Sequence, residues 1–124
     1  MLAPGDTFLF AEEDDEKLHL NIVITQPNES GEVVTVSVMT RHRRSDAMVP
    51  LERGDHPFIE RPSVIAFAYA KIVIVADIER LIQGGDAFKR EPIAEKFVIR
   101  ARDGCLESED TPGDVVQFLG DLLR

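Results

Sequence analysis

Two segments in the first third of the chain alternate hydrophobic and polar positions, which is typical of β-strands. Residues 18–25 and 32–40 alternate in this way and are rich in β-branched side chains. The turn-rich stretch 26–31 joins them, so the pattern predicts an antiparallel hairpin. Its clearest hydrophobic face, which we expect to point into the core, consists of Val34, Val36 and Val38. The Pro-Gly-Asp turn at 4–6 predicts a further strand, 7–10, before the hairpin.

The middle of the chain is more apolar and its period is less clear. Residues 47–51 are consistent with a short strand, and Pro50 places that strand at the edge of a sheet. Residues 63–70 and 71–76 are mostly apolar and ambiguous in period, and the run of β-branched side chains at 72–75 favours strands, as one bent or bulged pair.

Helices are expected toward the C-terminal end. Residues 77–83 fit a short helix, with Asp77 as its cap and Gly84-Gly85 as its stop. Residues 94–100 fit either a helix or a strand.

The last segment, 111–123, has the features of a helix that begins with a cap. Thr111 is a cap residue, a proline follows it, and Asp114 stands three residues after the cap. The hydrophobic face that should pack on the rest of the protein consists of Val115, Val116, Leu119, Leu122 and Leu123.

Together these elements predict a mainly β fold: a small barrel over about residues 3–82 and a C-terminal extension that ends in the helix. A length of 124 residues predicts a single domain. The 44% hydrophobic and 30% charged composition is that of a globular protein and excludes a disordered one. There is neither an apolar run long enough to span a bilayer nor a signal-peptide pattern, so we expect a cytoplasmic protein without membrane contact.

The charge is acidic overall but uneven. A net charge of −9 opposes binding to nucleic acid at long range. An acidic run occupies 12–16, and a basic run, Arg41-His42-Arg43-Arg44, follows the predicted hairpin. Such a basic loop could hold a phosphate chain, although a charge run is more often just a solvated loop.

Candidate chemistry is limited to a few side chains. The sequence contains no phosphate-binding glycine loop, dinucleotide motif or nucleophile elbow. Its single cysteine, Cys105, allows no internal disulfide, and its acidic surroundings argue against a nucleophile. Three histidines, His19, His42 and His56, stand beside turns or at strand ends. Each could move protons near neutral pH. The simpler alternatives are a packed strand residue, a solvated loop residue and a turn histidine bonded to the backbone, respectively.

The order of segments resembles a divergent branch of the MazF/PemK toxin family over about residues 3–82. The resemblance rests on the turn and strand at 4–10, the strand at 19–25, the strand end at 36–40, the apolar strand at 63–70 and the helix at 77–83. It implies an SH3-like barrel with a C-terminal helix. It also implies a metal-independent endoribonuclease without a cofactor, which cuts single-stranded RNA, is usually a homodimer and is neutralised by an antitoxin protein.

The resemblance also assigns roles. The family uses an Arg at the start of the second strand and a Thr or Ser at the end of the third. Thr40 matches the second position, but His19 stands near the first, so Arg41 or Arg43 would have to supply the cation. In this hypothesis His56, with His19, moves protons, Arg41 clamps the phosphate and Thr40 positions it, so these groups should converge on one open face. The basic run of residues 41–44 would hold the RNA.

Two alternatives of other classes remain open. The missing Arg and the net charge favour a catalytically silent barrel that binds a protein partner. A third possibility is a regulatory subunit whose acidic run docks a basic partner.

Overall fold

A computed structural model describes residues 2–11, 17–42 and 48–122. The acidic run 12–16, Arg43, Arg44 and the ends of two predicted elements, Ala47 and Leu123, lie outside these described residues. The elements, in chain order, are β1 (Thr7–Ala11), β2 (Leu18–Val23), β3 (Glu32–Thr40), β4 (Pro50–Leu51), β5 (Ser63–Ile74), α1 (Val75–Gln83), β6 (Phe88–Arg90), α2 (Glu95–Glu107) and α3 (Gly113–Leu122). The mainly β fold class is confirmed.

The strands form one antiparallel sheet in the order β4-β5-β3-β2-β1-β6. The predicted hairpin is confirmed, with Leu20 opposite Val38 and Ile22 opposite Val36. In its connecting turn, the side-chain oxygen of Asn28 accepts hydrogen bonds from the amides of Ser30 and Glu32, at 3.0 and 2.9 Å. The local sequence therefore fixes both the strands and the turn between them.

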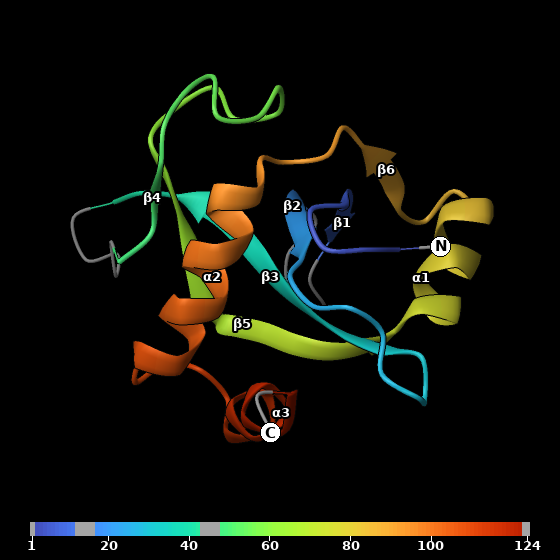
Figure 1. Cartoon of the computed structure of the whole chain (residues 1–124). Coiled ribbons are helices and arrows are strands. Elements are labelled where there is room, and N and C mark those ends of the chain that lie inside the picture. The colour runs from blue at the N-terminus through green and yellow to red at the C-terminus, as the bar shows by residue number, and fades with distance from the viewer. Residues whose placement is uncertain (1, 12–16, 43–47, 123–124) are drawn as a thin grey trace.

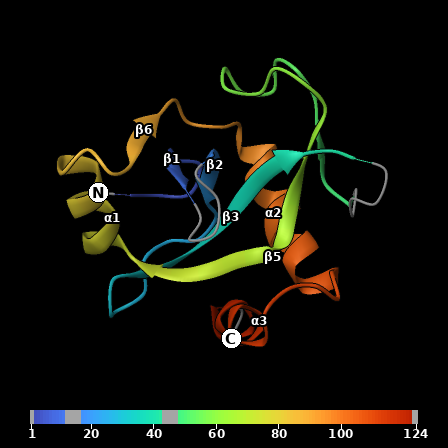
Figure 2. The ribbon, with the colours of Figure 1, turned by 180° about the vertical axis from the view of Figure 1, so that it is seen from behind.

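The segments 63–70 and 71–76 are one strand rather than two. β5 runs without interruption from Ser63 to Ile74, and the last two residues of the prediction belong to α1. Its pairing with β3 shifts register between Thr35 and Ser37, so the expected bulge is present. A bulge bends a strand and increases its twist. The sheet is curled into a half-barrel (Figures 1 and 2).

The helices lie where the sequence pattern predicted them, but not every predicted cap residue is correct. α1 begins at Val75 with Ile74 as its cap, so the prediction that Asp77 caps it is wrong; Asp77 lies in its first turn. The glycine stop is confirmed: Gly84 is the C-cap and Gly85 has φ +81°, a conformation that favours glycine. Of the ambiguous segment 94–100, Ala94 is the extended N-cap and residues 95–100 are helical, as part of α2.

The C-terminal helix is present, but two expectations about it are wrong. Thr111 does not cap it, because its buried hydroxyl has no hydrogen-bond partner among the described residues. The carbonyl of Pro112 accepts hydrogen bonds from the amides of Val115 and Val116. Val115 and Leu119 are buried as expected, whereas Val116 and Leu122 are 38% and 47% exposed. The face that packs is therefore narrower than the sequence pattern indicated.

The two faces of the sheet pack against different helices. Val34, Val36 and Val38 are buried as predicted, in a cluster that includes Phe97 of α2 and Leu119 of α3. Figures 1 and 2 show α2 lying on one side of β3 and β5. The opposite face is also buried in part, because α1 covers it in a second cluster. Members of that cluster are Leu2, Phe8, Val23, Val33, Val75, Ile78 and Ala87.

The sheet has two edge strands, β4 and β6, that do not pair with each other in the described part of the chain. β6 was not predicted, and it extends the sheet beyond residue 82. Pro50 is in the other edge strand, as expected. Within the described ranges, no helix is long and apolar enough to cross a bilayer.

Candidate functional site

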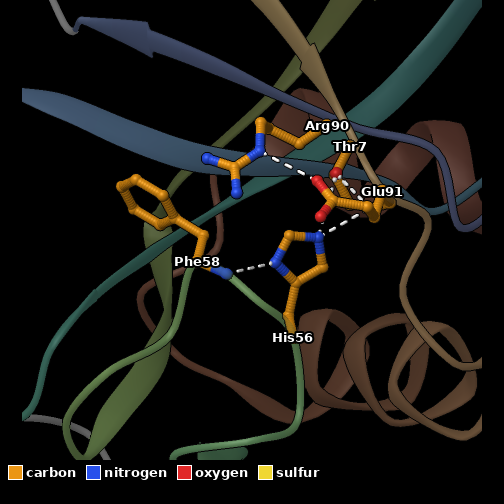
Figure 3. A network of polar contacts seen from close by, with 5 residues as sticks. All are labelled: Thr7, His56, Phe58, Arg90 and Glu91. Carbon is orange, nitrogen blue, oxygen red and sulfur yellow. Dashed lines mark hydrogen bonds and ion pairs between the residues drawn. The ribbon is translucent and has the colours of Figure 1, made fainter.

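The two edges of the curled sheet are joined by one buried histidine. His56 lies in the loop 52–62 that follows β4, and its side chain is 2% exposed. Its Nδ1 accepts a hydrogen bond from the amide of Phe58 at 3.0 Å. The ring proton is therefore on Nε2, which lies 2.6 Å from the carbonyl oxygen of Glu91 and donates to it. Thr7 of β1 donates to the same carbonyl at 2.7 Å (Figure 3).

This network ties the segment after one edge strand to the segment after the other. Glu91 directly follows β6, and His56 follows β4 by five residues. Both ring nitrogens of His56 face backbone groups, and the Thr7 hydroxyl lies 3.4 Å from Nε2. The arrangement matches the alternative of a turn histidine bonded to the backbone.

A cavity of about 360 Å³ opens beside this network. β2 starts at it, β3 ends at it, and the loop 52–62 and the end of β6 complete its walls. Its polar and aromatic lining includes Lys17, His19, Thr40, Phe58, Arg61 and Arg90. Because β2 and β3 are antiparallel, the start of one and the end of the other meet at the same end of the sheet.

Positive charge gathers in this cavity. Its described lining has three Lys or Arg side chains against one acidic residue, Glu60. One of the cations, Arg90, donates a hydrogen bond from Nε to the Glu91 carboxylate at 3.0 Å and lies 5.4 Å from the centre of the Phe58 ring. The hydrogen bond from Arg90 lowers the pKa of the Glu91 carboxyl, and the backbone amide of Glu91 acts in the same direction. The carboxylate thus stays ionised and holds the guanidinium in place.

The structure brings two of the predicted site residues together at this cavity. Thr40 is exposed at the end of β3, and His19, 9% exposed, lies near the start of β2. Both line the cavity, whereas His56 and Arg41 do not, although Pro57 and Phe58 next to His56 do.

The predicted basic loop contributes to a different part of the surface. The guanidinium of Arg41 donates to the Glu52 carboxylate at 2.8 Å and to the carbonyl of Ser63 at 3.2 Å. His42 lines a second cavity of about 260 Å³, together with Thr40 and Tyr69. Arg43 and Arg44 lie outside the described residues.

Four of the lining residues, Lys17, Phe58, Arg61 and Arg90, were not singled out from the sequence. They come from three separate segments, and β6, which carries the last of them, was not predicted. The sequence signal that was available is local: Phe58 and Arg61 follow His56 in the same loop.

The described residues contain neither a group arranged to bind a metal nor a reactive thiol. Within 2–11, 17–42 and 48–122, no three or more His, Cys, Asp or Glu side chains are grouped as metal ligands would be. Cys105 is fully buried in α2, and burial raises the pKa of its thiol to about 12. Its low nucleophilicity therefore comes from burial rather than from the acidic neighbours that the sequence suggested.

Comparison with known proteins identifies no relative of this chain. No protein-family model, no curated protein and no solved structure matches the chain.

Proposed function

We propose that the chain binds single-stranded RNA in the cavity between Lys17, Thr40 and Arg61 and cleaves it without a metal ion, as MazF/PemK toxins do. The observation that carries this proposal is the concentration of cations in one cavity of a protein whose net charge is −9. A phosphate chain requires local positive charge, and a pocket with low-dielectric walls focuses the field of its own side chains.

The arrangement of β2 and β3 supports the resemblance. The family places a cation at the start of the second strand and a hydroxyl at the end of the third, and here His19 and Thr40 stand at these positions on one cavity. Lys17 and Arg61 supply the positive charge that the missing family Arg would have provided, since Arg90 is already paired with the Glu91 carboxylate. The curled antiparallel sheet with a C-terminal helix supports an SH3-like barrel.

The proposed chemistry uses the cavity residues in separate roles. His19 accepts the proton of a ribose 2′-hydroxyl, and the 2′-oxygen attacks the adjacent phosphorus. The bond from phosphorus to the 5′-oxygen breaks, and that oxygen takes a proton from water, which leaves a cyclic phosphate and a 5′-hydroxyl end. The proton on His19 then neutralises the hydroxide that the water leaves, and this restores the base. Arg61 and Lys17 stabilise the charge that develops on the phosphoryl oxygens, and Thr40 hydrogen-bonds to one of them. A cytoplasmic location, a homodimer and an antitoxin partner belong to the same proposal.

The test is cleavage of a long single-stranded RNA in the presence of EDTA. We expect the wild-type protein to cut, and His19→Ala and Arg61→Ala to lose most of the activity while remaining folded. Arg53→Ala is the matched control, because Arg53 is an exposed cation of the same loop and does not line the cavity. A wild-type protein that does not cut, or variants at residues 19 and 61 that cut normally, would refute the catalytic assignment.

A second candidate, binding without cleavage, is favoured by the state of His56. Both its ring nitrogens face backbone groups, so the described cavity lining contains one histidine, His19. A ribonuclease without metal ordinarily uses both an acid and a base. RNA binding that His19→Ala leaves unchanged, with no cleavage by any variant, would select this silent module.

A further inference from the structure

Phe58 and Arg90 form a cation–π pair in the wall of the cavity. The guanidinium carbon of Arg90 lies 5.4 Å from the centre of the Phe58 ring, and both residues line the cavity. Figure 3 shows the guanidinium between the Phe58 ring and the His56–Glu91 network. The planar aromatic group comes from the loop 52–62 and the planar cation from β6, two segments far apart in the sequence.

Both members of this pair are held by the same histidine. Nδ1 of His56 accepts the amide of Phe58, and Nε2 donates to the carbonyl of Glu91, the residue that follows Arg90. The Glu91 carboxylate then binds Nε of Arg90 at 3.0 Å. Hydrogen bonds therefore hold the amide of Phe58, the backbone next to Arg90 and the Arg90 guanidinium. The Phe58–Arg90 pair is thus a platform that is in place without a ligand.

We infer that this platform takes one unpaired nucleobase, which stacks on the Phe58 ring beside Arg90 while the neighbouring phosphates lie on Lys17 and Arg61. The inference rests on the proposed function and adds to it how the single strand is held: one base is turned out of the strand and stacked. Aromatic rings and guanidinium planes are the groups on which proteins stack unpaired bases. A cavity of about 360 Å³ is within the range of pockets for small ligands, so it suits one base rather than a duplex.

The base also explains why an aromatic residue stands in a cationic cavity. Phosphate binding alone requires cations and hydrogen-bond donors and gains nothing from a half-buried phenyl ring. Phe58 packs against the main core cluster on one part of its surface and lines the cavity with another. A ring in that position offers an apolar surface to the planar part of a nucleotide.

The experiment measures binding of a short single-stranded RNA that carries 2-aminopurine, by anisotropy and by quenching of the base fluorescence. It uses catalytically inactive His19→Ala as the background, so that the probe stays intact. We expect Phe58→Leu to weaken binding by roughly 10- to 100-fold and to abolish quenching, since each stacked base contributes about that much. Phe58→Tyr should restore both. Phe88→Leu is the matched control, because Phe88 is an exposed aromatic residue of β6 outside the cavity.

Two further probes separate this inference from the proposed function. An oligonucleotide without bases should bind about as weakly to the background protein as the full RNA binds to Phe58→Leu, and the fluorescence of a labelled duplex should not change when the protein is added. If Phe58→Leu binds and quenches as well as its background while Arg61→Ala loses affinity, the stack is wrong and RNA binding stands. If the background protein binds none of the probes, the proposed function itself fails. If Phe58→Leu lowers the melting temperature, Arg90→Lys gives the same test, because lysine keeps the positive charge but lacks the planar guanidinium.

Discussion

The imidazole of His56 lies 2.6 Å from the carbonyl oxygen of Glu91, and this contact closes a sheet whose edge strands are not paired with each other in the described chain. His56 follows β4 and Glu91 follows β6, so the bond joins the two open sides of the half-barrel. The same ring accepts the amide of Phe58. One buried side chain thus fixes both the shape of the sheet and the wall of the cavity.

Replacing His56 should therefore reduce the stability of the fold, and any effect on RNA cleavage should follow from that loss. In His56→Ala the amide of Phe58 loses its acceptor and the carbonyl of Glu91 keeps only Thr7 as a side-chain donor. An unsatisfied buried polar group costs about 1–3 kcal/mol. We expect a loss of that size in the free energy of unfolding, measured by urea titration with the slope unchanged.

His42→Ala provides the comparison for that measurement. His42 is exposed two residues after the end of β3, and substitutions of exposed residues usually change stability by less than about 0.5 kcal/mol. If His56→Ala were as stable as His42→Ala and still lost RNA cleavage, His56 would be acting in the chemistry and the structural role argued here would be wrong.

Local patterns were sufficient for most of the sheet. Alternation over 32–40 fixes which valines face the core, because successive side chains of a strand point to opposite faces. β6 escaped prediction because it has three residues, Phe88–Arg90, too few to display a period, and it becomes a strand only by pairing with β1. The covered second face, where Val33 and Thr35 are fully buried, likewise depends on partners elsewhere in the chain.

Only part of the candidate site could be predicted from the sequence, because the rest depends on contacts between distant segments. His19 and Thr40 were found because they stand at the ends of two strands that form a predictable hairpin. Arg61 and Arg90 reach the cavity through the loop that follows one edge strand and through the other edge strand itself, and no spacing rule relates residue 61 to residue 90.

Two helical glycines offer a matched pair of stability tests. A Cβ added to Gly104 of α2 would lie 2.3 Å from Cζ of Phe67, a fully packed ring of β5, whereas a Cβ on Gly120 of α3 would meet nothing within 4 Å. Overpacking a core costs about 1–3 kcal/mol. In an open helical position, Gly→Ala stabilises by about 0.5–1 kcal/mol. We expect thermal melting to move down for Gly104→Ala and up for Gly120→Ala; a shift in the same direction for both would contradict the packing of α2 on β5.

The C-terminal helix should respond to substitution according to its observed, narrower face. Leu119 is 4% exposed within the main core cluster, so Leu119→Ala should reduce the free energy of unfolding by about 2–5 kcal/mol. Leu122, on the same helix, is 47% exposed, and Leu122→Ala should cost well under half as much. Denaturant titration of the two variants measures the difference. Equal losses would mean that the helix packs through the wider face that its sequence pattern suggested.

The buried thiol of Cys105 gives a test of the α2 packing that needs no substitution. Burial raises the pKa of this thiol from 9.0 to about 12, so at pH 8 it is protonated as well as shielded from solvent. The thiolate is the reactive form, and we expect a disulfide reagent to modify the folded protein far more slowly than the protein in urea. This pKa shift also makes the stability of the protein depend on pH. Between pH 9 and 12 the unfolded thiol releases its proton, whereas the folded thiol keeps it. The contribution of this group to the free energy of unfolding therefore declines as the pH rises through that window. Cys105→Ala should remove that part of the alkaline decline. Rapid labelling of the folded protein at pH 8 would show that α2 leaves the sheet readily, and the packing described here would then have to be revised.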